Sequence, residues 1–118
     1  MLEKFERFTQ RAKSFQPKVS IRKRGQIALN SGAIQKFGLE KYNYVVLFMS
    51  KDRQKIAIMF TNDRNEEGAI KLLKRQGNFS FSAKSFCDFY GIDCSQTRSY
   101  DAEWIAKEHA IVIDISKK

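Results

Sequence analysis

Apolar and polar residues alternate along several short stretches of this sequence. The alternation in "VSIRKR" (residues 19–24) is typical of a half-buried strand. After Gly25, "QIAL" (26–29) repeats it. The runs "YVVLFMS" (44–50) and "KIAIMF" (55–60) predict a buried strand and a returning strand, joined by a polar turn.

A short helix is predicted between the second and third of these strands. Asn30 is a favoured N-cap residue, and Gly38 fits the position just after a helix C-terminus. Apolar residues recur between them at helical spacing, over about 31–37. The first half of the chain therefore reads strand, strand, helix, strand, strand.

The pattern begins again after the polar linker "TNDRNEEG" (61–68). "NFSF" (78–81) predicts a strand, Ser82 an N-cap, and Gly91 the end of a helix at about 83–90. The closing strands are "RSYDAEWI" and "AIVIDI". The aligned positions are Gly25 with Gly77, Ile27 with Phe79, Leu29 with Phe81, Asn30 with Ser82, Ile34 with Phe86 and Phe37 with Phe89.

This internal repeat predicts an α+β fold that is mostly β with short helices. A single strand-strand-helix-strand-strand unit cannot easily bury both sheet faces, whereas two units can close on each other. We expect a pseudo-twofold β-barrel in one domain, residues 1–118. Residues 18–60 form the first repeat, 69–116 the second, and 1–16 an N-terminal helix.

The N-terminal helix is predicted from an apolar stripe: Leu2, Phe5, Phe8, Ala12 and Phe15. Pro17 ends it. We expect Leu2, Phe5, Phe8 and Phe15 to pack on the domain or on a second copy, which leaves a homo-oligomer open. Basic residues on the polar face would suit a membrane surface, but Glu3 and Glu6 weaken that interpretation.

Charge is unevenly distributed along the chain, whose formal net charge is +9. Residues 1–24 hold eight basic and two acidic residues, whereas residues 78–118 hold five and six. This asymmetry favours a basic face that meets a polyanion such as nucleic acid. The alternative is a solubilising charge without a partner.

Other functions find little support in the sequence. No apolar run is long enough for a membrane helix, and the charged N-terminus is unlike a secretory signal, so we expect a cytoplasmic protein. Cys87 and Cys94 are interpreted as small packing residues and His109 as a solvated loop residue, so we predict no metal and no cofactor. Asp101 and Glu103 share a strand face but lack a nearby base, so we predict no enzymatic activity.

The first repeat resembles the AbrB/MazE/SpoVT family of swapped-hairpin DNA-binding domains. The resemblance covers residues 19–60 and rests on Gly25, Gln26, Ile27, Leu29, Ile34, Gly38 and Leu39. Asn30 stands where the family has a proline, and "EKYNY" replaces the family's later Gly-Asp turn. The chain has no acidic tail like that of MazE-type antitoxins, which makes an antitoxin role less favoured.

The resemblance implies a double-stranded-DNA-binding transcriptional regulator. In the family, basic residues before the first glycine contact DNA, and here these are Arg22, Lys23 and Arg24. Arginine can reach phosphate or pair with guanine, and Gln26 can pair with adenine. The second repeat offers Lys74, Arg75 and Gln76 at the same place. We expect both turns to form one contact surface.

Two alternatives remain at the level of sequence. A single-stranded nucleic-acid binder would stack bases on aromatic side chains, and exposed Tyr42, Tyr100 or Trp104 would favour it. A scaffold or oligomerisation module would bind no nucleic acid at all. In that case the basic turns would be neutralised by acidic residues of the same protein.

Overall fold

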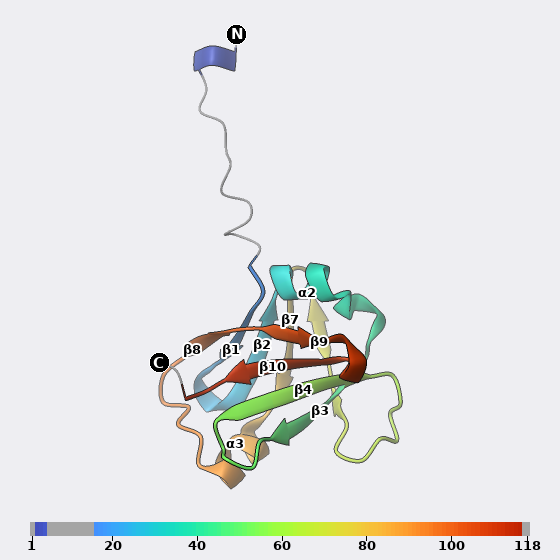
Figure 1. The fold of residues 1–118 in the computed structure, drawn as a ribbon, viewed down its shortest axis with the longest axis vertical. Coiled ribbons are helices and arrows are strands. Elements are labelled where there is room, and N and C mark those ends of the chain that lie inside the picture. The colour runs from blue at the N-terminus through green and yellow to red at the C-terminus, as the bar shows by residue number, and fades with distance from the viewer. Residues whose placement is uncertain (1, 5–15, 117–118) are drawn as a thin grey trace.

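The computed structural model describes residues 2–4 and 16–116, and within them ten strands form two antiparallel sheets of five (Figure 1). The strands are β1 (Lys18–Ile21), β2 (Gln26–Asn30), β3 (Tyr44–Met49), β4 (Lys55–Thr61), β5 (Ile70–Lys71), β6 (Leu73–Arg75), β7 (Asn78–Ser82), β8 (Arg98–Asp101), β9 (Glu103–Ile105) and β10 (Ala110–Asp114). The helices are α2 (Ser31–Phe37) and α3 (Lys84–Tyr90), with 3-10 turns η1 (Leu2–Lys4), η2 (Lys23–Gly25), η3 (Leu39–Lys41) and η4 (Ala106–Glu108). The predicted α+β class, mostly β, is confirmed.

The two sheets pack against each other across one hydrophobic core. Sheet A has the strand order β6-β7-β2-β1-β8, and sheet B has β5-β3-β4-β10-β9. Alternate residues of each strand face inward, as the two-residue period requires. The inward residues include Val19, Ile27, Leu29 and Phe81 of sheet A and Val45, Ile56, Ile58, Ile111 and Ile113 of sheet B.

The predicted closed barrel is wrong, because the strands divide into two sheets. The chain bends at Leu72, between β5 and β6, and at Ala102, between β8 and β9. Each of these segments therefore pairs with sheet A on one side of the bend and with sheet B on the other. The run "RSYDAEWI", predicted as one strand, is for this reason two.

Helix α2 begins and ends where its capping residues predict. The side chain of Asn30 accepts a hydrogen bond from the backbone N–H of Ala33 at 2.9 Å. Gly38 takes the left-handed conformation, with φ of 63°, and its N–H donates to the carbonyl of Ile34. Both ends thus satisfy backbone groups that the helix leaves open.

Helix α3 differs from the prediction at its start. Ser82 is not the N-cap, because it remains in β7 and pairs with Gln26 of β2. Ala83 takes the cap position without a side-chain hydrogen bond, and its N–H donates to the carbonyl of Gly25 at 2.8 Å. Gly91 ends the helix in the left-handed conformation, as predicted.

The apolar pair predicted on this helix is only partly buried. Phe86 is half-buried, whereas the side chain of Phe89 is 76% exposed. Cys87 instead faces the core and is buried, which confirms its interpretation as a packing residue. Residues two apart on an α-helix point about 200° apart, so Phe89 must face away when Cys87 faces inward.

The predicted N-terminal helix lies largely outside the described residues. Leu2–Lys4 form the 3-10 turn η1, while residues 5–15 are not described. The packing of Phe5, Phe8 and Phe15 therefore stays a prediction. In the described part of the chain, no helix has the length and apolar character that crossing a membrane requires.

Candidate nucleic-acid interface

Sheet A turns a polar surface away from the core. Its outward residues alternate with the buried ones along β1, β2, β6, β7 and β8. We call these residues the polar face: Lys18, Ser20, Arg22, Gln26, Ala28, Asn30, Leu73, Arg75, Asn78, Ser80, Ser82, Ser99 and Asp101. Apart from Ala28 and Leu73, each of these side chains can form hydrogen bonds.

Hydrogen bonds orient the side chains in the middle of the polar face. The Arg22 guanidinium donates to Gln26 Oε1 at 3.4 Å, and Gln26 Nε2 donates to Ser80 Oγ at 3.3 Å. The hydroxyls of Ser20 and Ser99 lie 2.8 Å apart and share a hydrogen bond. The first two contacts link Arg22, just after β1, to Gln26 on β2 and through it to Ser80 on β7.

Two arginines lie at opposite corners of the polar face. Arg22 precedes the first turn, and its N–H donates to the Gln26 carbonyl at 2.7 Å. Arg75 pairs with Asn78 across the second turn. Strand geometry separates the two arginines by three strand spacings and four residues, or about 20 Å between Cα atoms. They can therefore contact different phosphates, but not the same one.

The first turn, η2, has a tightly constrained backbone. Arg24 and Gly25 both have positive φ, at 70° and 81°. A Cβ on Gly25 would lie 2.7 Å from the Cα of Lys84, so glycine is required there. Lys23 and Arg24 are exposed at the tip of this turn. The turn thus presents two cations from a backbone that packs against α3.

The second turn lies at the other end of sheet A. Gln26, beside the first turn, pairs with Ser82, whereas Asn78, beside the second, pairs with Asn30. Gln76 is exposed there, and the cleft beside it is lined by residues of α2 such as Ile34. We expected the two turns to form one contact surface, but they lie at opposite ends of sheet A and do not form one cluster. Of the predicted residues, Arg22, Gln26 and Arg75 share the polar face.

Lys74 points away from the polar face. Its ammonium group donates to the carbonyl of Glu40 at 2.6 Å and to Asn43 Oδ1 at 3.1 Å. The same group lies 5.6 Å from the ring centre of Phe79. Strand alternation explains this orientation, since Lys74 pairs with the buried Phe79. Its side chain therefore joins β6 to the segment that precedes β3.

Sequence reasoning assigned Asn30 and Ser82 only capping roles, although both lie on the polar face. Asn30 also accepts a hydrogen bond from the N–H of Lys18 at 3.0 Å and donates to the carbonyl of Gln16 at 2.8 Å. Strand alternation could have found both residues. Local spacing could not show which residues they contact, because Asn30 bonds Lys18 of β1 and Ser82 pairs with Gln26 of β2.

The aromatic residues that would favour single-stranded binding are not openly displayed. Tyr42 is 8% exposed and its hydroxyl hydrogen-bonds His109 Nδ1 at 3.0 Å. Trp104 is half-buried and stacks on Phe37, with ring centres 5.2 Å apart. Tyr100 is also half-buried and packs against the core. His109, predicted to be solvated, is exposed, and its ring is hydrogen-bonded to the hydroxyl of Tyr42.

Three residues with shifted pKa values, Asp52, Cys87 and Asp93, lie away from the polar face. A hydrogen bond from the Ser50 hydroxyl lowers the pKa of Asp52, and one from Ser95 lowers the pKa of Asp93. Burial, reinforced by the neighbouring Cys94, raises the pKa of the Cys87 thiol to about 12.

The chemistry of the polar face is that of recognition by hydrogen bonds and charge. Among residues 2–4 and 16–116, no three His, Cys, Asp or Glu side chains gather closely enough to hold a metal ion. At the margin of the face, Asp101 forms an ion pair with Lys18. No family model, curated protein or solved structure matches this chain.

Proposed function

We propose that this protein is a non-catalytic nucleic-acid-binding module that contacts double-stranded DNA through the polar face and acts as a transcriptional regulator. The observation that carries the proposal is the combination on one face of two distant arginines with an oriented amide, Gln26. Arginines at opposite corners supply contacts to the phosphate backbone. The amide groups of Gln26 and Asn78 can pair with adenine in the major groove.

Internal symmetry of sheet A supports the proposal of two AbrB-like repeats. The central strands β2 and β7 pair as Gln26–Ser82, Ile27–Phe81, Ala28–Ser80, Leu29–Phe79 and Asn30–Asn78. The first residue after Gly25 therefore faces the fifth after Gly77, the third faces the third, and the fifth faces the first. A twofold axis between Ala28 and Ser80 would produce this register. Sheet B has a comparable centre, where Ala57 pairs with Val112 between β4 and β10.

Pseudo-twofold symmetry would suit a duplex target. DNA-binding dimers commonly place equivalent elements on two half-sites of a palindromic site. Here Arg22 and Arg75 would be such equivalent elements within one chain, each beside a glycine turn. The differing neighbours of the two arginines, Gln26 and Asn78, predict that the two half-sites differ in sequence. A single-stranded target is less well supported, since Tyr42 and Trp104 face inward.

The experiment compares binding to duplex and single-stranded DNA over a salt series. The double variant Arg22→Ala/Arg75→Ala should lower the slope of log affinity against log salt by about two units, because each phosphate contact contributes close to one. The control, Lys51→Ala/Lys107→Ala, removes the same charge from exposed positions in the β3–β4 turn and η4. It should leave the slope nearly unchanged.

Three results would count against the proposal. Equal slopes for the two double variants would remove the polar face as the contact surface. Tighter binding to single strands than to duplex would favour the single-strand alternative. If the intact protein binds neither form at low salt, the scaffold alternative stands.

A further inference from the structure

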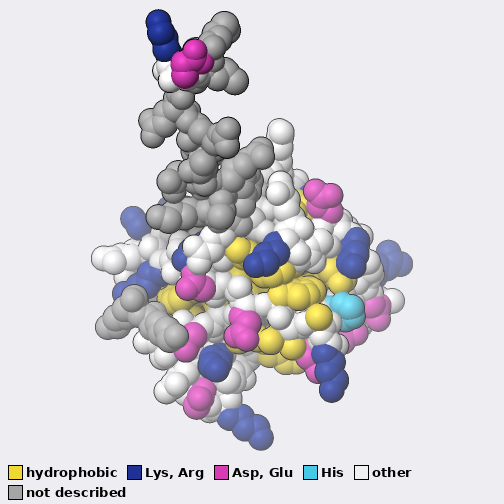
Figure 2. Space-filling view, turned by 45° about the horizontal axis from the view of Figure 1, so that its top comes forward, with side chains coloured by type: hydrophobic (Ala, Val, Ile, Leu, Met, Phe, Trp, Pro, Cys, Tyr) yellow, Lys and Arg dark blue, Asp and Glu magenta, His cyan; other side chains and the backbone are white. Residues whose placement is uncertain are grey.

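The outer surface of sheet B is apolar, in contrast to that of sheet A. Its strands turn Phe48, Ala57, Met59, Ile105, Ala110 and Val112 outward, around a hollow of about 350 Å³ that also touches Glu108. We call these six residues the apolar face. The most exposed of these side chains is that of Phe48, at 49%. Figure 2 shows hydrophobic side chains gathered on the molecule's surface, with charged side chains around them.

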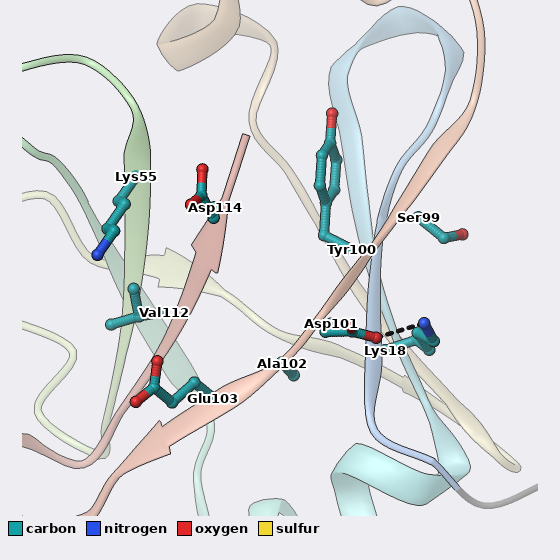
Figure 3. Close-up of a pocket in the computed structure, with 9 residues that line it drawn as sticks. All are labelled: Lys18, Lys55, Ser99, Tyr100, Asp101, Ala102, Glu103, Val112 and Asp114. Atoms are coloured by element: carbon teal, nitrogen blue, oxygen red, sulfur yellow. Dashed lines mark hydrogen bonds and ion pairs between the residues drawn. The ribbon is translucent and has the colours of Figure 1, made fainter. Parts of the chain in front are cut away.

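A polar groove leads from the apolar face to the start of β1. Val112 lines both the hollow and this groove. Figure 3 shows Asp101 at the end of β8 and Glu103 at the start of β9, with Asp114 on β10. The groove is lined by these three carboxylates and by two lysines, Lys55 and Lys18. Lys18, at its far end, is the residue that follows Pro17. A chain entering β1 passes directly beside it.

A contiguous apolar surface ringed by charge is typical of an interaction site. The same chain carries an apolar stripe at helical spacing, most of which lies outside the described residues: Leu2, Phe5, Phe8, Ala12 and Phe15. Fourteen residues in helical form would measure about 21 Å. The apolar face spans about 14 Å from β9 to β3, three strand spacings. The two surfaces therefore match in chemistry, and the segment is long enough to cross the apolar face.

Charge also matches between the segment and the groove. Arg11 and Lys13 lie at the end of the stripe nearest Pro17. The groove beside the apolar face presents three carboxylates, Asp101, Glu103 and Asp114, against two lysines, Lys18 and Lys55. Lys18 pairs with Asp101, so the groove carries an excess of one negative charge. Opposite charges at the rim of an apolar contact fix its orientation more than its strength. They favour an arrangement with the basic end of the segment over the groove.

In the described part of the chain, the apolar face remains open. Leu2–Lys4, the described start of the N-terminal segment, lies apart from both sheets (Figure 1). We propose that the apolar face binds the N-terminal segment, residues 2–15, of a second copy of this chain. The exchange is reciprocal, so that two copies close into a twofold dimer with no open apolar face. Lys18, Ser99 and Asp101 of the polar face also line the groove, but the rest of the polar face lies on the other sheet and stays free.

Sedimentation equilibrium of the full chain over a range of concentrations tests this dimer. Phe8→Asp and Val112→Asp change the two sides of the contact, and each should raise the dimer dissociation constant by at least about 30-fold. Phe89→Asp is the matched control, because it places the same charge on an exposed phenylalanine of α3, which is not part of the apolar face. It should leave the constant unchanged.

Circular dichroism of each variant guards against loss of folding. Phe8 precedes β1 in the sequence, so Phe8→Asp leaves the residues of both sheets unchanged and keeps the test informative if Val112→Asp unfolds. A monomeric wild-type chain at all concentrations would overturn the proposal, as would a dimer unaffected by Phe8→Asp. If the wild-type chain is a monomer and Phe8→Asp shifts the NMR signal of the Val112 methyl groups, the segment binds the apolar face of the same chain. That result would also exclude the exchange between two copies.

Discussion

The Cα of Lys84 lies 2.7 Å from the place that a Cβ on Gly25 would occupy. The two residues belong to opposite halves of the sequence, yet the first turn rests directly on the start of α3. The N–H of Ala83 donates to the Gly25 carbonyl in the same contact. The turn that carries Lys23 and Arg24 is therefore held by the other half of the chain.

Gly25→Ala should lower the free energy of unfolding by about 3 kcal/mol, from the positive φ together with the overlap with Lys84. Gly77→Ala is the matched control. Its φ is also positive, at 71°, but a Cβ there would meet no atom within 4 Å. It should cost only about 1 kcal/mol. Urea unfolding measures both, and equal losses would contradict the close approach.

Asn30→Ala should be more costly than Ser82→Ala, although sequence alone gives both residues the same role. The Asn30 side chain caps α2 and also bonds Lys18 and Gln16, so its loss should cost about 1–2 kcal/mol. Ser82 is exposed and does not cap α3. Its replacement should change stability by less than about 0.5 kcal/mol. Thermal unfolding of the two variants decides whether capping follows the predicted or the observed start of α3.

Arg75→Ala and Lys74→Ala remove the same charge from adjacent positions on opposite sides of β6. Arg75→Ala should reduce the salt slope of DNA binding by about one unit and leave stability nearly unchanged. Lys74→Ala should leave the slope nearly unchanged. It should lower the free energy of unfolding by about 1 kcal/mol, since its ammonium group bonds Glu40 and Asn43. The opposite assignment of the two effects would place the DNA contact on the other side of the strand.

The buried thiol of Cys87 should make the protein less stable in alkali. Burial raises its folded-state pKa to about 12 from an ordinary value of 9.0, so the folded state holds the proton more tightly. This contribution to stability is complete below about pH 9 and is lost as pH rises toward 12. Unfolding of wild type and Cys87→Ala in reductant, from pH 7 to 10.5, measures it. The wild-type stability should fall more steeply above pH 9, and parallel curves would contradict the assignment.

Sequence alone determined the features that depend on neighbouring residues. Alternation placed the inward residues of the strands, because a strand's side-chain period does not change with its partner. The start of α2 at Asn30 and the end of each helix at Gly38 and Gly91 follow from local backbone geometry and hydrogen bonding. The mostly β class follows from the same local signals.

Tertiary structure alone decided what depends on partners distant in the sequence. Ser82 pairs with Gln26 and so stays in a strand, which its own preference for helix caps could not reveal. Lys74 and Arg75 are equally basic, but the register with Phe79 and Asn78 sends them to opposite sides of sheet A. The bends at Leu72 and Ala102 also depend on tertiary structure, because the residues on the two sides of each bend pair with different sheets.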